Sequence, residues 1–258
     1  MAVELHGGGR RPSNVTSLEF APIQQLRAHE YVAEQIRRHI ALRLIGPGES
    51  LPSERELTGM FGSGRPTIQH ALRLLEAEHL VETRRGRCGG TFVSKPAADA
   101  GALDELIARV MGQHDELEEL LVYRRAIEPR VAAEAARTRR RADVVAMSSA
   151  IDSMSQAASE PDYMRHDTEF HLAVARATRN RFLVSAIEDV RLRLNDAISL
   201  LPESLTWHRR LSGEHEAVVA AVSSRDADAA EQAMYVHVAA SEQSIRAVLT
   251  AIRRRLAS

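Results

Sequence analysis

Residues 51–93 read LPSERELTGMFGSGRPTIQHALRLLEAEHLVETRRGRCGGTFV. The run Ser53-Glu54-Arg55-Glu56 has the S-x-x-E form of a capping box, which predicts a short helix over 53–61. Gly62-Ser63-Gly64 predicts a tight turn, and a second helix is expected over 65–79. Two helices joined in this way predict a helix-turn-helix, whose second helix can lie in the major groove of DNA.

The flanking segments complete a small domain. Two short extended runs, 80–84 and 91–93, surround the Gly-rich, basic loop 85–90, and this pattern predicts a β-hairpin, or wing. On the other side, apolar residues recur at helical spacing over 24–45, and Gly46-Pro47-Gly48 is expected to end that helix. The stretch therefore predicts a winged helix-turn-helix.

Side chains at the start of the second helix are candidates for base reading, because this end is exposed in the motif. They are Arg65, Thr67 and Gln69. Arginine pairs with guanine and glutamine with adenine, so two of these residue types suit base edges. Three arginines are candidates for phosphate or minor-groove contacts: Arg55 at the start of the first helix, and Arg85 and Arg87 in the wing. The alternative is a solvated basic hairpin of helices with no role in nucleic-acid binding.

The same stretch resembles the DNA-binding head of the GntR family of bacterial regulators. The match includes the run Leu51–Leu57, the helix start Arg65-x-Thr67 and the Arg-Gly-Arg wing. The resemblance implies DNA contacts at Arg55, Arg65, Thr67, Gln69 and the wing near Arg87 and Gly89. Gly64 stands where Ser or Thr commonly caps the recognition helix, and Pro66 and Gln69 replace the more usual Thr and Arg, so the operator sequence stays open.

Everything after Asp99 is expected to be helical, because aromatic residues are few and helix formers abound. The expected helices cover 101–112, 115–139, 141–157, 161–178, 181–200, 205–223 and 226–256. Short gaps between them favour an antiparallel all-α bundle. We therefore expect a mainly α protein with a flexible tail (1–21), a winged helix-turn-helix (22–96) and a helical effector-binding and dimerisation domain (97–258).

Charge and composition agree with a DNA-binding regulator in the cytoplasm. Positive charges outnumber negative ones over residues 1–98, and the balance reverses afterwards. The single cysteine, Cys88, excludes an internal disulfide. The start MAVELHGGGRRPS lacks the apolar core of a signal peptide, and no apolar run approaches the ~18 residues that span a bilayer. We expect a soluble, cytoplasmic protein with no membrane partner.

Four residues of ligand type in the helical part predict a cation site. Asp167 and His171 are four residues apart, which places both on one helix face. His215 and His237 lie on either side of the polar break 223–226, so they can face each other across a helix hairpin. One carboxylate and three imidazoles would leave coordination positions open for water or a ligand. The alternative is a set of hydrogen-bonded core histidines.

These residues also resemble the effector domain of the FadR-type branch of the GntR family. The pattern Asp167-x-x-Phe170-His171, followed by Asn180, His215 and His237, matches members that bind a divalent metal. The resemblance implies a metal bound by Asp167, His171, His215 and His237. Zinc is the first expectation from this ligand set, with nickel, manganese or iron as alternatives.

Arg124 lies on an apolar helix stripe and needs an anionic partner there. That partner is either an internal carboxylate, such as Glu128 one turn on, or the carboxylate of a small effector. The arrangement Arg124-x-x-x-Glu128-Pro129 also resembles the effector domain, and Arg191 and Asn195 are further candidates to line the same cavity.

The combined expectation is a homodimeric regulator, a repressor, that binds a near-palindromic DNA operator and responds to a small organic acid held by Arg124 and the metal. Two alternatives remain at this point. One is a metal-dependent hydrolase-like body fused to the head, although no general base or nucleophile is evident near the ligands. The other is a metal site that only stabilises the bundle. We expect a regulator and not an enzyme.

Overall fold

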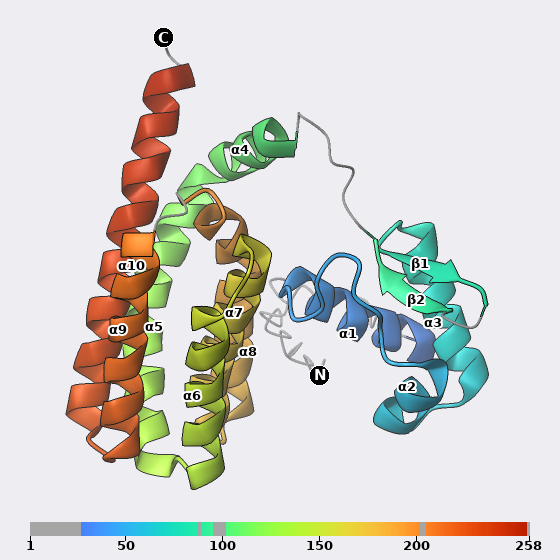
Figure 1. Ribbon diagram of the computed structural model, residues 1–258, viewed down its shortest axis with the longest axis horizontal. Coiled ribbons are helices and arrows are strands. Elements are labelled where there is room, and N and C mark those ends of the chain that lie inside the picture. The colour runs from blue at the N-terminus through green and yellow to red at the C-terminus, as the bar shows by residue number, and fades with distance from the viewer. Residues whose placement is uncertain (1–26, 87–88, 95–101, 202–204, 257–258) are drawn as a thin grey trace, which may run out of the picture.

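The computed structural model describes residues 27–86, 89–94, 102–201 and 205–256 (Figure 1). Within these ranges the chain forms a small head, residues 27–94, and a larger helical body, residues 102–256. Each part has a hydrophobic core of its own. The predicted tail 1–21, together with Arg87 and Cys88 of the wing, lies outside the described residues.

The head is a winged helix-turn-helix, as predicted. Its elements are α1 (Ala28–Ala41), α2 (Glu54–Phe61), α3 (Arg65–Ala77), β1 (Val81–Arg84) and β2 (Gly90–Val93). The two strands are antiparallel, with Val81 opposite Val93. Ser53 caps α2 through the predicted box with Glu56, and Gly62 ends that helix at a φ of 58°, a backbone conformation that glycine adopts without strain.

The first helix ends earlier than predicted. It stops at Ala41, not at Ile45, because Arg43 takes a left-handed conformation with a φ of 61°. The N–H groups of Arg43 and Leu44 then bond back to the carbonyls of Ile40 and His39, which satisfies the last turn. After this turn the chain places Leu44 against the hydrophobic core of the body.

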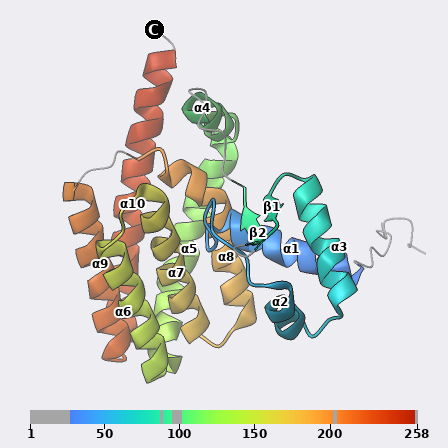
Figure 2. The ribbon, with the colours of Figure 1, turned by 45° about the vertical axis from the view of Figure 1, so that its right-hand side comes forward.

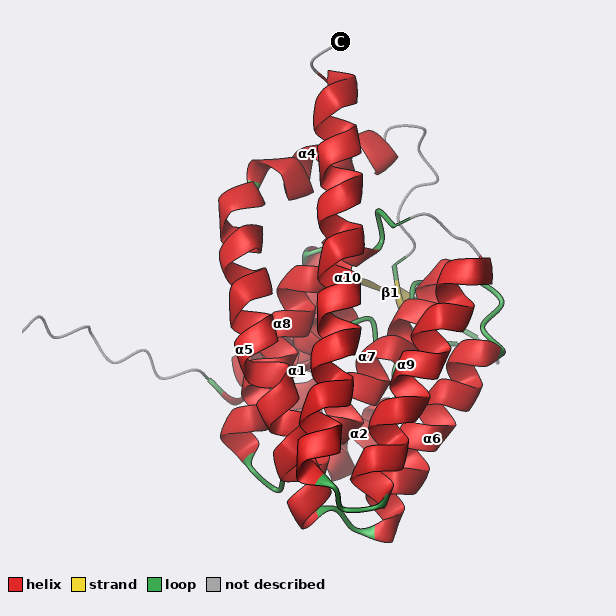
Figure 3. Cartoon of the chain, turned by 90° about the vertical axis from the view of Figure 1, so that its left-hand side faces the viewer, coloured by secondary structure: helices red, strands yellow, loops and turns green. Residues whose placement is uncertain are grey.

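The body is an antiparallel helical bundle, as predicted (Figure 3). Its helices are α4 (Ala102–Gly112), α5 (His114–Thr138), α6 (Arg141–Ser155), α7 (Glu160–Ala177), α8 (Arg181–Ile198), α9 (Leu205–Ser223) and α10 (Ala227–Leu256). Helix α5 packs against α7, α8, α9 and α10, and the end of α10 projects beyond the bundle. No described helix combines the length and the apolar character needed to cross a membrane.

Helix α1 of the head lies beside α8 of the body (Figure 2), and arginine–carboxylate pairs join the two parts. Arg38 of α1 donates from Nε to Glu188 at 3.0 Å and from Nη2 to Asp189 at 2.8 Å, both on α8. Glu49, in the loop after α1, pairs with Arg165 of α7. Side chains of both parts line a cavity of about 730 Å³ at this interface. The two body helices that contact the head, α7 and α8, also carry candidate site residues.

Candidate DNA-binding surface and metal centre

The start of α3 carries an exposed arginine that is already oriented. The side chain of Arg65 is 73% exposed, and its Nε donates to a Glu54 carboxylate oxygen at 2.8 Å. Gln69, one turn on, donates to the same oxygen at 3.0 Å. The hydrogen bond from Arg65 is the main reason why the pKa of Glu54 lies below its ordinary value. The two predicted reading residues thus share one anchor on α2.

The other predicted DNA contacts are more dispersed. Arg55 and Arg85 are exposed, whereas Thr67 is half-buried and its N–H bonds to the carbonyl of Gly64 at 3.0 Å. Gly89 is exposed next to the wing strand β2, and a Cβ there would lie 2.6 Å from the carbonyl oxygen of Arg84, so the loop requires glycine. Arg87 is outside the described residues.

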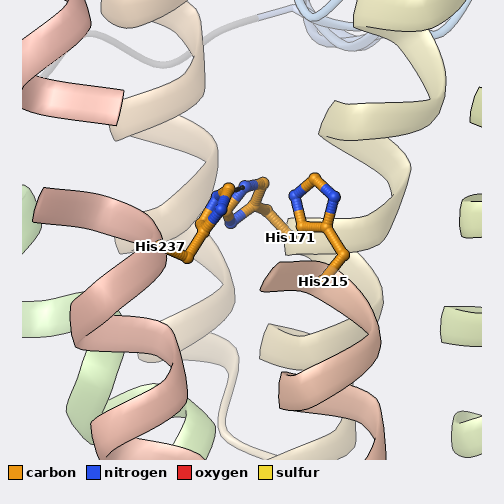
Figure 4. A group of neighbouring side chains, drawn as sticks. All are labelled: His171, His215 and His237. Carbon is orange, nitrogen blue, oxygen red and sulfur yellow. Dashed lines mark hydrogen bonds between the residues drawn. The ribbon is translucent and has the colours of Figure 1, made fainter. Parts of the chain in front are cut away.

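Three buried histidines converge in the body from three helices. His171 of α7, His215 of α9 and His237 of α10 occupy the space between these helices (Figure 4). Each offers a ring nitrogen, and these nitrogens lie within 4.8 Å of one another. The rings of His215 and His237 have centroids 4.4 Å apart across the α9–α10 hairpin, as the spacing predicted.

The outer nitrogens of two of these rings face carboxylates. His171 Nδ1 lies 2.6 Å from Glu128, and His237 Nδ1 lies 3.2 Å from Glu214. A neutral imidazole that donates from Nδ1 keeps its lone pair on Nε2. The Nε2 atoms of His171 and His237 are 3.3 Å apart, and when both rings donate from Nδ1 their lone pairs face each other. A cation between them would remove that repulsion, which is how a metal centre of imidazoles is built.

Asp167 lies beside two of the three histidines. Its Oδ1 lies 3.3 Å from His215 Nε2 and 3.9 Å from His171 Nε2, while Oδ2 accepts from Arg191 at 2.6 Å. Burial opposes ionisation of this carboxyl, but Arg191 and the imidazoles hold its pKa well below the ordinary value. Burial lowers the pKa of His171 and of His237. A carboxylate beside neutral imidazoles fits a divalent cation.

The predicted effector residues divide into two groups. Arg124 is held inside the protein, because its Nε donates to Glu128 and its Nη1 to Ser241, both at 2.7 Å. Arg191 is also buried, but its Nη1 has no hydrogen-bond partner among the described residues. The same is true of both amide atoms of Asn195, one turn along α8. Buried polar groups without a hydrogen-bond partner are rare, so these atoms of Arg191 and Asn195 need a partner such as a water molecule or a ligand.

Some functional neighbours could not be predicted from the sequence. Glu214 precedes His215 in the chain but contacts His237 across the hairpin, and nothing in the local sequence indicates this. Glu128 was expected only as a partner of Arg124. In the structure its second oxygen also faces His171, so that a single carboxylate joins Arg124 to the histidine cluster.

Comparisons with known proteins agree with both parts of the chain. Residues 28–93 match the model for bacterial regulatory proteins of the gntR family, and residues 119–240 match the FCD domain. The Uxu operon transcriptional regulator of Escherichia coli (strain K12) is 34% identical over 221 residues, covering 82% of this chain and 84% of its own length. The HTH-type transcriptional repressor NanR of Citrobacter rodentium (strain ICC168) is 31% identical over 230 residues, covering 86% of each chain. The chain therefore belongs to the GntR family of DNA-binding transcription regulators, which are not enzymes, in the FadR-type branch with a helical FCD domain.

Proposed function

We propose that the protein is a metal-dependent repressor whose affinity for its operator is set by a small organic acid. Residues 22–96 form the DNA-binding domain, residues 97–258 bind the effector and dimerise, and the homodimer acts on a near-palindromic operator in the cytoplasm. The proposal rests on buried polar atoms of Arg191 and Asn195, near the histidine cluster, that have no hydrogen-bond partner among the described residues. The names of two relatives, an operon regulator and a repressor, support the direction of control.

In this proposal the metal is held by Asp167, His171, His215 and His237, with zinc as the first candidate. The ion would act as a Lewis acid that accepts a carboxylate oxygen of the effector. Glu128 and Glu214 lie next to the Nδ1 atoms of His171 and His237, and would hold these two rings in orientation. Such outer partners typically change metal affinity 10–100-fold when removed, so Glu214→Gln should weaken zinc binding by roughly 10-fold or more in calorimetric titration. The matched control is Glu216→Gln, which removes an exposed carboxylate from the same helix.

Arg191 is the stronger candidate to hold the effector carboxylate. It has a spare N–H group, whereas a ligand that approached Arg124 would have to compete with Glu128 for it. Asn195 offers a donor and an acceptor, which suits a hydroxyl or carbonyl group on the same ligand. Arg124 then contributes mainly by holding Glu128 next to Nδ1 of His171.

Effector binding can reach the head through α7 and α8. Asp167 and Arg191 lie on the buried side of these helices, while Arg165, Glu188 and Asp189 bind the head from the other side. The site residues are buried, so a ligand that contacts them must displace the surrounding helices. The ligand changes DNA affinity only if it binds one arrangement of the heads more tightly than another.

The decisive experiment titrates a panel of small organic acids into zinc-loaded protein and into the variant Asn195→Leu. Leucine has a similar volume and removes the unmet amide, so the variant should be at least as stable as the wild type, by up to about 1–3 kcal/mol, yet lose effector binding. Unchanged binding of every acid by Asn195→Leu would contradict the effector site.

Two further variants test the remaining parts. Arg65→Ala should weaken binding to an operator selected from a random library far more than binding to random DNA, and Arg37→Ala, within α1, is the control. His215→Ala separates a sensing metal from a structural one. If it lowers the melting temperature but leaves effector affinity unchanged, the metal only stabilises the bundle.

A further inference from the structure

Two histidines outside the metal centre lie against each other in the head. His29, at the start of α1, and His70, in α3, stack with ring centroids 3.8 Å apart and planes inclined by 9°. His70 is exposed and His29 is half-buried. The lone pairs of parallel rings lie in two separate planes and do not converge on one point, so this pair is not built as a shared metal site.

His70 belongs to the exposed side of the recognition helix. The opposite side of α3 is buried in the head and consists of Ile68, Ala71, Leu72 and Leu75. At 3.6 residues per turn, Pro66, His70 and Arg73 follow one another along the exposed side, next to Gln69. A helix-turn-helix presents this side of its second helix to the major groove and the phosphates that border it.

The surroundings of His70 are cationic. The charged or titratable groups that act on it are Arg27, His29 and Glu30 from α1 and its start, and Arg73 from α3. Glu30 is the single carboxylate among them, and its oxygen already accepts the backbone N–H of Arg27 at 2.7 Å. A cationic surface beside base-reading residues is the usual footprint of a phosphate contact.

We propose that the His29–His70 pair binds a phosphate of the DNA backbone beside the bases read by α3, and that the pair takes up one proton from solvent when it does so. Two stacked imidazoles accept one proton more readily than two, because the second charge is repelled by the first. The phosphate supplies the opposite charge that stabilises the imidazolium, and its oxygens accept the ring N–H groups.

In the free protein the surroundings of His70 disfavour its protonation. Desolvation of the ring and the nearby His29, Arg73 and Arg27 lower the pKa of His70 below its ordinary value of 6.5, while Glu30 acts in the other direction. A bound phosphate raises that pKa. A group whose pKa is higher in the complex takes up a proton on binding, so DNA affinity should increase as the pH falls through the range between the two pKa values.

The test measures fluorescence anisotropy of a labelled random-sequence duplex of about 24 base pairs at about pH 6 and about pH 8, at fixed salt. We expect wild-type protein to bind about 3–10-fold more tightly at the lower pH, since one proton changes affinity at most 10-fold per pH unit. The double variant His29→Gln/His70→Gln should bind the duplex about equally at both pH values. His39→Gln, at an exposed site on α1, should behave as wild type. All variants keep the histidines of the body, so the difference isolates the pair.

His70→Arg provides a gain-of-function test that survives if the double variant folds poorly. A permanent charge should give it at about pH 8 the affinity that wild type reaches at about pH 6. The salt dependence adds a second readout: the slope of log K against log salt should be steeper for wild type than for the double variant by about 0.9 at the lower pH only. Equal pH dependence in wild type and double variant, or no gain in His70→Arg, would overturn the proposal.

Discussion

Glu128 holds two buried cationic or titratable partners at once. One carboxylate oxygen accepts from Arg124 and the other faces His171, and all three side chains are almost completely buried. Burial opposes the charge of Glu128, but His171 and Arg124 together keep its pKa below the ordinary range. A buried charge of this kind is tolerated only while its partners remain, so the three residues act as a unit.

Replacing one member of this unit should therefore be costly. We expect Glu128→Gln to lower the free energy of unfolding by about 3–5 kcal/mol, because Arg124 is left buried without a full counter-charge. The double variant Arg124→Met/Glu128→Met should lose less unfolding free energy than the single variants Arg124→Met and Glu128→Met lose together. Urea unfolding of the metal-free protein measures these losses. Additive losses would show that the two side chains do not depend on each other.

The histidine cluster predicts how metal-free protein responds to acid. His171 and His237 have lowered pKa values in the fold, so below about pH 6.5, the ordinary value, the unfolded chain takes up protons that the fold does not. Stability should be full above that pH and fall below it by up to about 1.4 kcal/mol per histidine per pH unit. Asp167 and Glu128, with lowered pKa values, add to the loss only below their ordinary values of 3.8 and 4.5.

This expectation is checked by chemical unfolding between about pH 8 and about pH 5.5 in the presence of a chelator. His237→Gln should reduce the slope of stability against pH by about one proton. A flat profile for wild type would mean that these imidazoles titrate normally in the fold.

At the scale of single elements, the recognition helix lacks a side-chain cap. Gly64 occupies the N-cap position of α3 with extended backbone angles and no capping hydrogen bond. A Cβ built there meets only the Cδ of Pro66 at 3.6 Å, so a larger residue fits. The N-terminal end of α3 therefore lacks the side-chain cap that Ser53 gives to α2.

Gly64→Ser should give α3 the N-cap side chain that it lacks. The hydroxyl can accept a backbone N–H of the first turn, which is worth a few tenths of a kcal/mol over glycine, and can donate to a DNA phosphate. We expect a slightly higher melting temperature and about 2–5-fold tighter binding to random DNA, as one added neutral hydrogen bond allows. Gly64→Ala, which adds the Cβ without the hydroxyl, should gain neither.

The sequence predicted most elements because their limits are local. Apolar periodicity, the Ser53 box and the Gly-rich turns place the helices and strands to within a few residues. The end of α1 was missed because Arg43, not a glycine, takes the left-handed conformation there. The histidine cluster could be predicted from helix spacing, whereas Glu214 beside His237 depends on the angle between two helices, which the sequence does not show.

At the scale of the whole molecule, neighbouring arginines of α1 have different roles. Arg37 pairs within the head, with Glu34 and Glu78, whereas Arg38 pairs with Glu188 and Asp189 of the body. The pairs of Arg38 are partly buried, so they contribute more than an exposed ion pair would. One side chain thus links the stability of the head to that of α8.

Arg38→Gln should weaken this link, and Arg37→Gln is the matched control. Zinc at about 100 times its dissociation constant should stabilise the body by about 2.7 kcal/mol. In wild type we expect part of this gain to appear as slower hydrogen exchange in α1, and in Arg38→Gln we expect it to remain in the body. If zinc protects α1 equally in both variants, the head is linked to the body by other contacts.

The three histidines of the cluster come from three different helices, so a bound ion would cross-link distant parts of the chain. An ion bound to His171, His215 and His237 would close two loops of the chain, much as a cross-link does, and would remove conformations from the unfolded state. Helix α10, the last described element, is held in the bundle by its packing against α5 and α9. With the ion bound, detachment requires breaking a coordinate bond, so resistance of α10 to a protease would report metal occupancy directly.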